Sequence, residues 1–193
     1  MKNKEKILLR CAELGDPESM YRVAALYARS NRVYEALQWL LSASKVKYAK
    51  AFGPLGVFYD YGYFVEKNLD KAISLWMEGV DLGDSESMYY LAYQYEYGNG
   101  IKKDSDRALE LHTRSADLGN ANSIYALYYN YKWGGIVREN AALTEEWHCK
   151  LLKQEEKDRS KELETRFPSL YEFLDYCPTL VAEARISGEN NDN

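Results

Sequence analysis

The residues best suited to chemistry in this chain are its two histidines, His112 and His148, the second of which is followed by Cys149. Imidazole and thiolate groups bind zinc, and an imidazole near a hydroxyl can act as a general base. The histidines stand 36 residues apart at the same phase of a repeat, however, and equivalent positions in stacked helix pairs lie about 10 Å apart. Neighbours such as His148 and Cys149 point to different faces of a helix. We therefore predict no metal site.

Motifs for catalysis are equally sparse. The spacing assembles no Ser-His-Asp arrangement, glycine-rich phosphate loop or zinc motif, and Gly98-Asn99-Gly100 is typical of a turn. Cys11, Cys149 and Cys177 are odd in number and scattered, which favours reduced thiols over a disulfide framework. The sequence thus predicts no catalytic residue, no cofactor and no enzymatic activity.

A sequence motif that recurs along the chain predicts where the helices that carry these residues begin and end. Residues Asp81 to Tyr89 return as Asp117 to Tyr125, and a third copy, Ala12 to Tyr21, opens the chain. Gly83 and Gly119 are 36 residues apart. A period of this length indicates a stacked array of small structural units.

Each unit is predicted to be a pair of helices. In the best copy, apolar and small residues recur at helical spacing from Ser87 to Tyr95, the glycines at 98 and 100 end the first helix, and Asp104 caps the second. The first unit is four residues shorter between its helices, and residues 4–14 resemble a second helix that caps the N-terminal end. The units are predicted at approximately 16–47, 48–83, 84–119 and 120–155.

The C-terminal end departs from the repeat. Glu155 stands where the next glycine is due, and the helix is predicted to continue through residues 153–159. Residues 156–186 are predicted to form a cap with two short amphipathic helices, and residues 187–193 a disordered tail. Residues 1–186 are expected to form one domain.

The ordered positions of the third unit, from Ser87 to Gly119, resemble the Sel-1-like repeat (SLR) family, a relative of tetratricopeptide arrays. The resemblance covers roughly residues 4–152, with Trp39 and Trp147 at the family's tryptophan position and Leu111 replacing it in the third unit. It implies an all-α, right-handed solenoid whose first helices line a concave face, and a role as adaptor or scaffold. Cysteine-rich secreted members that bind penicillins carry paired cysteines, which this chain lacks.

In the second, third and fourth units, the side of the first helix opposite its packing face carries aromatic residues, whereas in the first unit it carries Arg22 and Arg29. Counting from the small residue that opens each unit, positions 3, 6, 7 and 10 form this stripe, where an exposed helix normally carries Lys and Glu. Tyr and Trp with few charges are typical of interface cores. The alternative is that neighbouring or C-terminal helices cover the stripe. The predicted partner-binding residues are Arg22, Arg29, Val57, Phe58, Tyr61, Tyr90, Tyr93, Gln94, Tyr97, Tyr129, Asn130 and Trp133.

Composition limits the class of partner. The chain has 193 residues, a net charge of -5 and 18 tyrosines, which favours a protein partner over nucleic acid and is compatible with a basic partner surface. No segment reaches the length of a membrane span or a signal peptide, so a cytoplasmic, bacterial-type protein is expected. Two alternatives stay open: an immunity protein that neutralises a toxin, and a hydrolase acting on cell-wall or β-lactam substrates. Oligomeric state is open as well.

Overall fold

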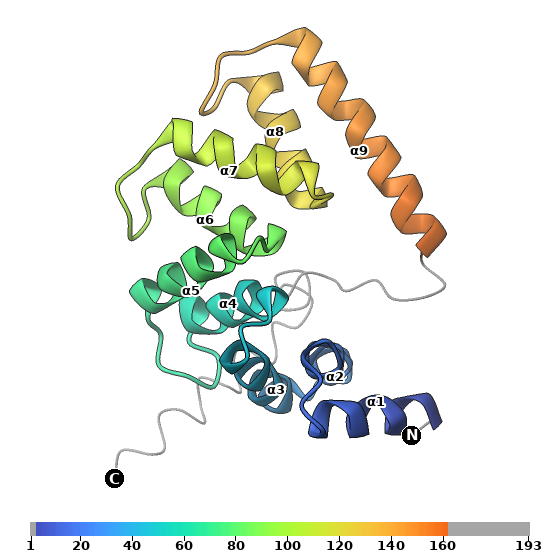
Figure 1. Cartoon of the computed structure of the whole chain (residues 1–193). Coiled ribbons are helices and arrows are strands. Elements are labelled where there is room, and N and C mark those ends of the chain that lie inside the picture. Colours follow the sequence, from blue (N-terminus) through green and yellow to red (C-terminus); the bar gives the residue numbers. More distant parts are fainter. Residues whose placement is uncertain (1–2, 162–193) are drawn as a thin grey trace. The chain divides into compact units, whose positions relative to one another are not determined.

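The computed structural model describes residues 3–161, and within this range every regular element is a helix (Figure 1). These elements fall into two compact units, one up to Leu75 and one from Trp76. The prediction of a single domain over residues 1–186 stays a prediction, and the capping helices and tail expected beyond Lys161 lie outside the described residues. The elements are α1 (Asn3–Glu13), α2 (Pro17–Arg29), α3 (Val33–Lys45), the 3-10 helix η1 (Ala49–Ala51), α4 (Phe52–Tyr61), α5 (Leu69–Asp81), α6 (Ser85–Tyr97), α7 (Ser105–Asp117), α8 (Ala121–Trp133) and α9 (Ala141–Lys161).

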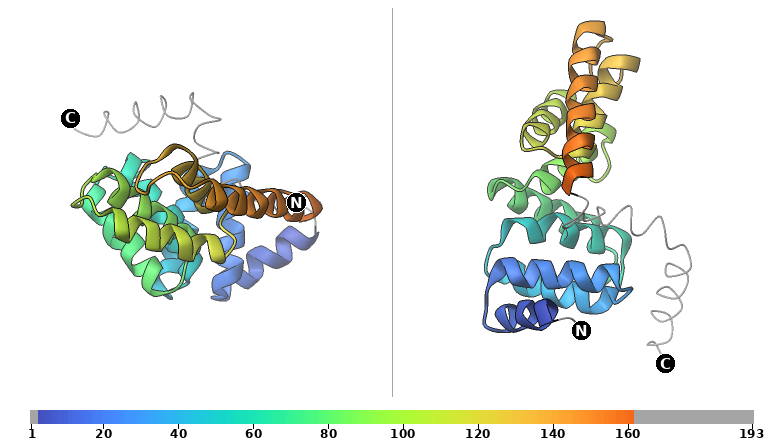
Figure 2. Two further views of the ribbon diagram at one scale, coloured as in Figure 1. Left: turned by 90° about the horizontal axis from the view of Figure 1, so that it is seen from above. Right: turned by 90° about the vertical axis from the view of Figure 1, so that its right-hand side faces the viewer.

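The helices pack in sequential order, as an all-α repeat array requires. In the first unit α1 packs on α2, α2 on α3 and α3 on α4; in the second, α6 packs on α7, α7 on α8 and α8 on α9. The fold class, the helix pairs and the N-terminal half repeat, which is α1, are thus confirmed. Figure 2 shows that α9 runs along α8 and extends past the N-terminal end of α8, as the missing glycine at position 155 predicts.

The first helices begin at side-chain caps. A carboxylate or amide three residues ahead of the small residue accepts a hydrogen bond from that residue's backbone N–H, which satisfies a free donor at the helix start. In the second repeat Tyr48 occupies the cap position, has no such oxygen to offer, and η1 precedes α4 instead. The capping pairs are Asp16 with Ser19 (2.8 Å), Asp84 with Ser87 (2.8 Å) and Asn120 with Ser123 (3.0 Å).

A backbone hydrogen bond closes the loop inside every repeat. The carbonyl of the tyrosine at position 8 accepts it from the residue that caps the second helix. The acceptor and donor are nine residues apart in three repeats and five apart in the first, which matches the four residues missing there. The bonds are Arg32 N to Tyr27 O (2.8 Å), Asn68 N to Tyr59 O (2.8 Å), Asp104 N to Tyr95 O (3.0 Å) and Asn140 N to Tyr131 O (2.9 Å).

The core of the second unit is built from repeat positions. Leu111 and Trp147, which share one position, are both buried, and Trp147 clusters with Ala116, Ile124 and Leu127 where α7, α8 and α9 meet. Asp104 caps α7 as predicted, accepting from the backbone N–H of Arg107 at 3.0 Å. Across residues 3–161, the helices are too short or too polar to cross a bilayer.

Candidate interaction surface

The predicted stripe divides into buried and exposed side chains. In the third and fourth repeats, position 7 is buried and position 3 is buried or half-buried, whereas positions 6 and 10 are open. The reason is that a first helix contacts its own second helix and the neighbouring repeat, so only a narrow strip stays free. The first two repeats differ, because Arg22 at position 3 is exposed and Val57 at position 6 is buried. The exposed residues are Arg22, Arg29, Tyr61, Tyr93, Tyr97, Tyr129 and Trp133; the buried ones are Val57, Phe58, Tyr90, Gln94 and Asn130.

Two exposed tyrosines lie one turn apart on α6. The ring centroids of Tyr93 and Tyr97 are 4.5 Å apart, and their planes are inclined by 42°. Burial, followed by the charge of Glu96 and the nearby Tyr93, raises the pKa of Tyr97 above its ordinary value. The phenol therefore stays protonated at neutral pH and can donate a hydrogen bond.

A longer row of aromatic residues runs along α8. Tyr125, Tyr129 and Trp133 follow one another at intervals of four residues, with ring centroids separated by 5.8 Å and then 6.4 Å. The Lys132 ammonium lies 5.1 Å from the Trp133 ring centroid, within the range of a cation–π contact. Tyr125 occupies position 2 and was not predicted, although its spacing of four residues from Tyr129 is the signal that indicates it.

We call Tyr93, Tyr97, Tyr125, Tyr129 and Trp133 together the aromatic surface. Each is between 44% and 61% exposed. All five lie on α6 and α8, the first helices of consecutive repeats within the second unit. Such large, rigid aromatic groups are the residue types that dominate binding energy at protein interfaces.

Buried amide chemistry holds the two helices in place. The Asn130 side chain donates to Ala126 O on its own helix (3.0 Å) and to Glu96 Oε1 on α6 (3.5 Å), and it accepts from the backbone N–H of Ile136 (2.9 Å). A Cβ on Gly135 would clash with the Asn130 amide oxygen, which is held by its own hydrogen bond, so only glycine fits there. The predicted site residue Asn130 thus positions the aromatic surface from beneath.

Glu96 also begins a buried chain of polar groups that sequence spacing did not predict. His112 Nε2 lies 3.3 Å from Glu96 Oε2, and His112 Nδ1 lies 3.5 Å from Ser123 Oγ. The Ser123 hydroxyl donates to Ser115 Oγ (2.8 Å), which donates to the carbonyl of Ser85 (2.6 Å). The structure therefore brings a serine, a histidine and a carboxylate together from three helices.

The direction of these hydrogen bonds distinguishes the chain from a catalytic triad. In a triad the serine hydroxyl donates to the imidazole, which then acts as its base. Here the Ser123 proton points to Ser115, because the only Ser115 proton is committed to a carbonyl. Ser123 is also fully buried and His112 is 1% exposed. This network ties α6, α7 and α8 together and offers a substrate no accessible nucleophile.

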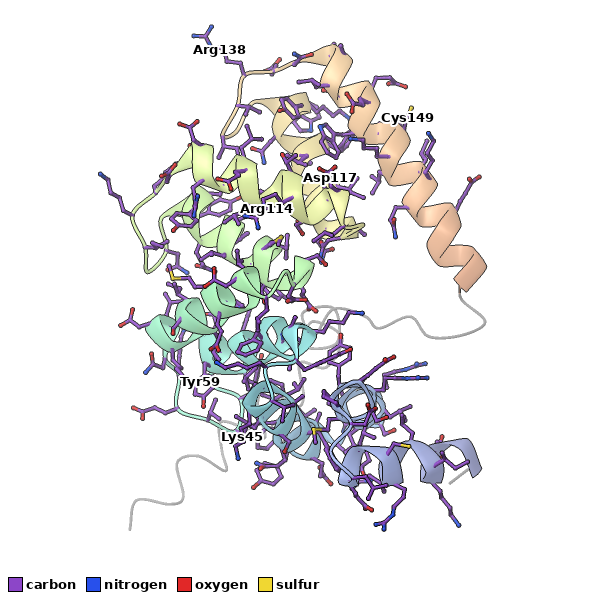
Figure 3. The ribbon with its side chains drawn as sticks, in the orientation of Figure 1. Lys45, Tyr59, Arg114, Asp117, Arg138 and Cys149 are labelled. Atoms are coloured by element: carbon purple, nitrogen blue, oxygen red, sulfur yellow. The ribbon has the colours of Figure 1, made fainter. Side chains whose placement is uncertain are left out.

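The remaining histidine and the described cysteines lie apart. His148 packs against the Tyr128 ring at 5.3 Å, while Cys149 is exposed on α9 and points away from α8 (Figure 3). Cys11 is half-buried on α1. No cluster of three His, Cys, Asp or Glu side chains arranged to hold a metal ion occurs within residues 3–161.

The first unit carries its own exposed aromatic residues. Tyr61 stacks on Tyr63, with ring centroids 5.4 Å apart and planes inclined by 8°. On α3, Tyr34 makes an edge contact with Phe64 at 5.8 Å. The predicted residues Arg22 and Arg29 are both exposed on α2. These pairs are smaller than the aromatic surface of the second unit.

The repeats of this chain are similar to Sel1 repeats of known proteins. The Sel1 repeat model matches residues 55–84 and 85–120. A Sel1 repeat protein from Oxalobacter formigenes is 28% identical with a TM-score of 0.69, over 77% of this chain and 63% of that one. A protective antigen of uropathogenic Escherichia coli strains, with an SLR fold, is 22% identical with a TM-score of 0.64, over 78% of this chain and 33% of that one.

A third structure and a sequence search complete the comparison. Cysteine-rich protein B of Helicobacter pylori is 23% identical with a TM-score of 0.51, over 63% of this chain and 90% of that one. The chain thus spans about two thirds of the first of these relatives and one third of the second. The sequence matches none of the curated proteins.

Proposed function

We propose that this chain, in which residues 55–84 and 85–120 match the Sel1 repeat model, acts as a non-enzymatic adaptor or scaffold that binds another protein through its aromatic surface. Sel1 repeats generally serve as protein interaction modules, and repeat arrays use an extended face for binding. The observation that carries the proposal is the row of exposed rings on α6 and α8, held in place by Asn130 and Glu96.

The chemistry of this surface favours a partner with apolar and aromatic groups. The net charge of -5, which suggested a basic partner, comes entirely from residues 162–193. This segment holds seven acidic and two basic residues. Residues 1–161 contain equal numbers of acidic and basic residues. We therefore assign affinity to ring contacts and orientation to the tyrosine hydroxyls.

The alternatives gain no specific support. Ser123 is buried and its hydroxyl donates to Ser115, so it cannot serve a hydrolase as an accessible nucleophile. An immunity protein would be one form of the proposed binding function. It would differ from an adaptor only in the identity of its partner, a toxin.

The test is partner capture from the native host with matched variants. Tyr93→Ala combined with Tyr129→Ala removes one ring from each helix, and Tyr34→Ala removes an equally exposed ring from α3 as a control. Hot-spot rings contribute about 2 kcal/mol or more each, so the double variant should lose at least about a hundredfold in affinity for the captured partner. Equal capture by all three proteins would refute the proposal.

A further inference from the structure

The aromatic surface lies next to the point where the described chain ends. Gln154 of α9 lies beside Gly119, two residues before α8 begins at Ala121: its amide oxygen is 3.6 Å from the position of a Cβ built on Gly119. The seven residues from Glu155 to Lys161 then carry α9 about 10 Å past the start of α8, at 1.5 Å per residue. The chain that follows therefore leaves from the end of α8 at which the row of rings begins.

Residues 162–193 have the composition of a ligand for this surface. The stretch from Phe167 to Tyr176 contains four aromatic residues and two leucines within ten positions. It also holds Glu172 and Asp175, and the Lys132 ammonium lies 5.1 Å from the Trp133 ring centroid. The aromatic residues of the segment can pack against the rings of the aromatic surface, and its two carboxylates can pair with Lys132. The segment and the surface are therefore complementary in residue type and in charge.

The length of the chain allows the contact. The six Cα-to-Cα steps from Lys161 to Phe167 span about 20 Å when extended, which matches the distance of about 20 Å along the helix axes from Lys161 back to Tyr125. The row from Tyr125 to Trp133 is about 12 Å long at the helical rise. Ten further residues cover that length in either a helical or an extended conformation.

We propose that residues 167–176 bind the aromatic surface of α6 and α8 in the same molecule, so that the chain carries its own competitor for the partner. This inference rests on the proposed function of that surface. A tether of five residues gives the segment an effective concentration in the millimolar range. Weak contacts therefore suffice to occupy the surface, and an external partner has to displace the segment.

The first experiment maps the contact in the full-length chain. Cys11→Ser and Cys149→Ser leave Cys177 as the single thiol, next to the proposed segment, for a benzophenone label. After irradiation and digestion, cross-links should join Cys177 to peptides of α6 and α8, and Phe173→Ala with Tyr176→Ala should reduce their yield at least fivefold. Cross-links confined to other helices, or unchanged in that variant, would overturn the proposal.

A mixture of ¹⁴N- and ¹⁵N-labelled chains separates contacts within one molecule from contacts between copies. Cross-linked peptides of a single isotope are expected. Mixed pairs at the statistical proportion would assign the segment to a second copy and overturn the assignment to the same molecule.

Tryptophan quenching gives an independent measure. Trp76 and Trp147 are buried and Trp39 is half-buried, so Trp133 is the most exposed of the four. The Phe173→Ala and Tyr176→Ala variant should raise acrylamide quenching, and the increase should vanish in a Trp133→Phe background. Quenching that does not change in the tail variant would overturn the proposal.

Partner binding distinguishes failure of this inference from failure of the proposed function. The tail variant should bind the captured partner severalfold more tightly than the natural chain does. If Tyr93→Ala with Tyr129→Ala abolishes cross-linking yet spares the partner, the segment binds the surface and the proposed function is wrong. If that variant loses the partner while the cross-links never map to α6 and α8, the proposed function stands and this inference is wrong.

Discussion

The strongest test of the fold is replacement of His112, because the structure separates it sharply from the equivalent His148. His112 is 1% exposed and joins three helices, through Glu96 on α6 and Ser123 on α8. Its ring also lies 5.9 Å from that of Tyr89. His148 is half-buried and packs against Tyr128, so it provides the matched control.

The expected loss follows from these contacts. The hydrogen bond from His112 Nε2 to Glu96 contributes about 1.5–3 kcal/mol, because its acceptor is a charged carboxylate. The aromatic contact adds about 0.5–1.5 kcal/mol. His112→Ala should therefore lower the free energy of unfolding by about 3 kcal/mol, and Tm by about 6–12 °C for a chain of this length. His148→Ala should cost about 1 kcal/mol or less.

Urea denaturation followed by circular dichroism measures both variants. A third variant, His112→Phe, keeps a ring against Tyr89 but leaves Glu96 and Ser123 without their imidazole partner. It should retain most of the loss, which would assign the stability to the polar network rather than to ring volume. Equal losses for the His112 and His148 alanine variants would refute the structural role of the network.

Two further predictions concern helix starts. Asp84 is buried and accepts from both the backbone N–H and the hydroxyl of Ser87 (2.8 and 2.6 Å), whereas Asp16, which caps α2 by accepting from Ser19, is exposed to water. Because burial makes the loss of a hydrogen-bond partner more costly, Asp84→Ala should cost about 2–3 kcal/mol and Asp16→Ala about 1 kcal/mol in urea unfolding. A reversed order would contradict the capping argument. Burial and then the charge of Asp84 raise the pKa of Glu86 from 4.5 to about 8. Because the pKa of Glu86 is higher in the folded state than in the unfolded state, the natural chain should lose stability relative to Glu86→Gln as pH rises from about 4.5 to about 8. The loss should be at most about 1.4 kcal/mol per pH unit. A difference in urea midpoint between the two proteins that does not depend on pH would contradict this prediction.

Repeat register predicted most of the described fold. The spacing of Gly83 and Gly119 gave the helix pairs, the Asp104 cap and the half repeat at α1, because each depends on local sequence. The absence of a glycine at position 155 predicted the extension of α9. These features are determined within about ten residues of chain, where helical periodicity and capping are reliable guides.

The candidate site was predicted less completely. A helical wheel gave a stripe with one open side, yet Gln94 and Asn130 are buried because adjacent repeats also cover that side. The contact of Asn130 with Glu96 joins residues 34 positions apart, and that of His112 with Glu96 joins residues 16 apart. Such pairs depend on how one repeat is rotated against the next, which periodicity does not specify.

The hydrogen bond that closes each loop offers another way to count the repeats of this array. Its acceptor is always the carbonyl of the tyrosine at position 8, and the same bond forms in the first repeat although its loop is four residues shorter. Turn length can therefore drift during evolution while the stacking persists. A sequence profile with fixed spacing scores a shortened repeat poorly, and the repeat closed by Arg32 and Tyr27 is one of this kind. Counting the loop-closing hydrogen bonds instead identifies all four repeats.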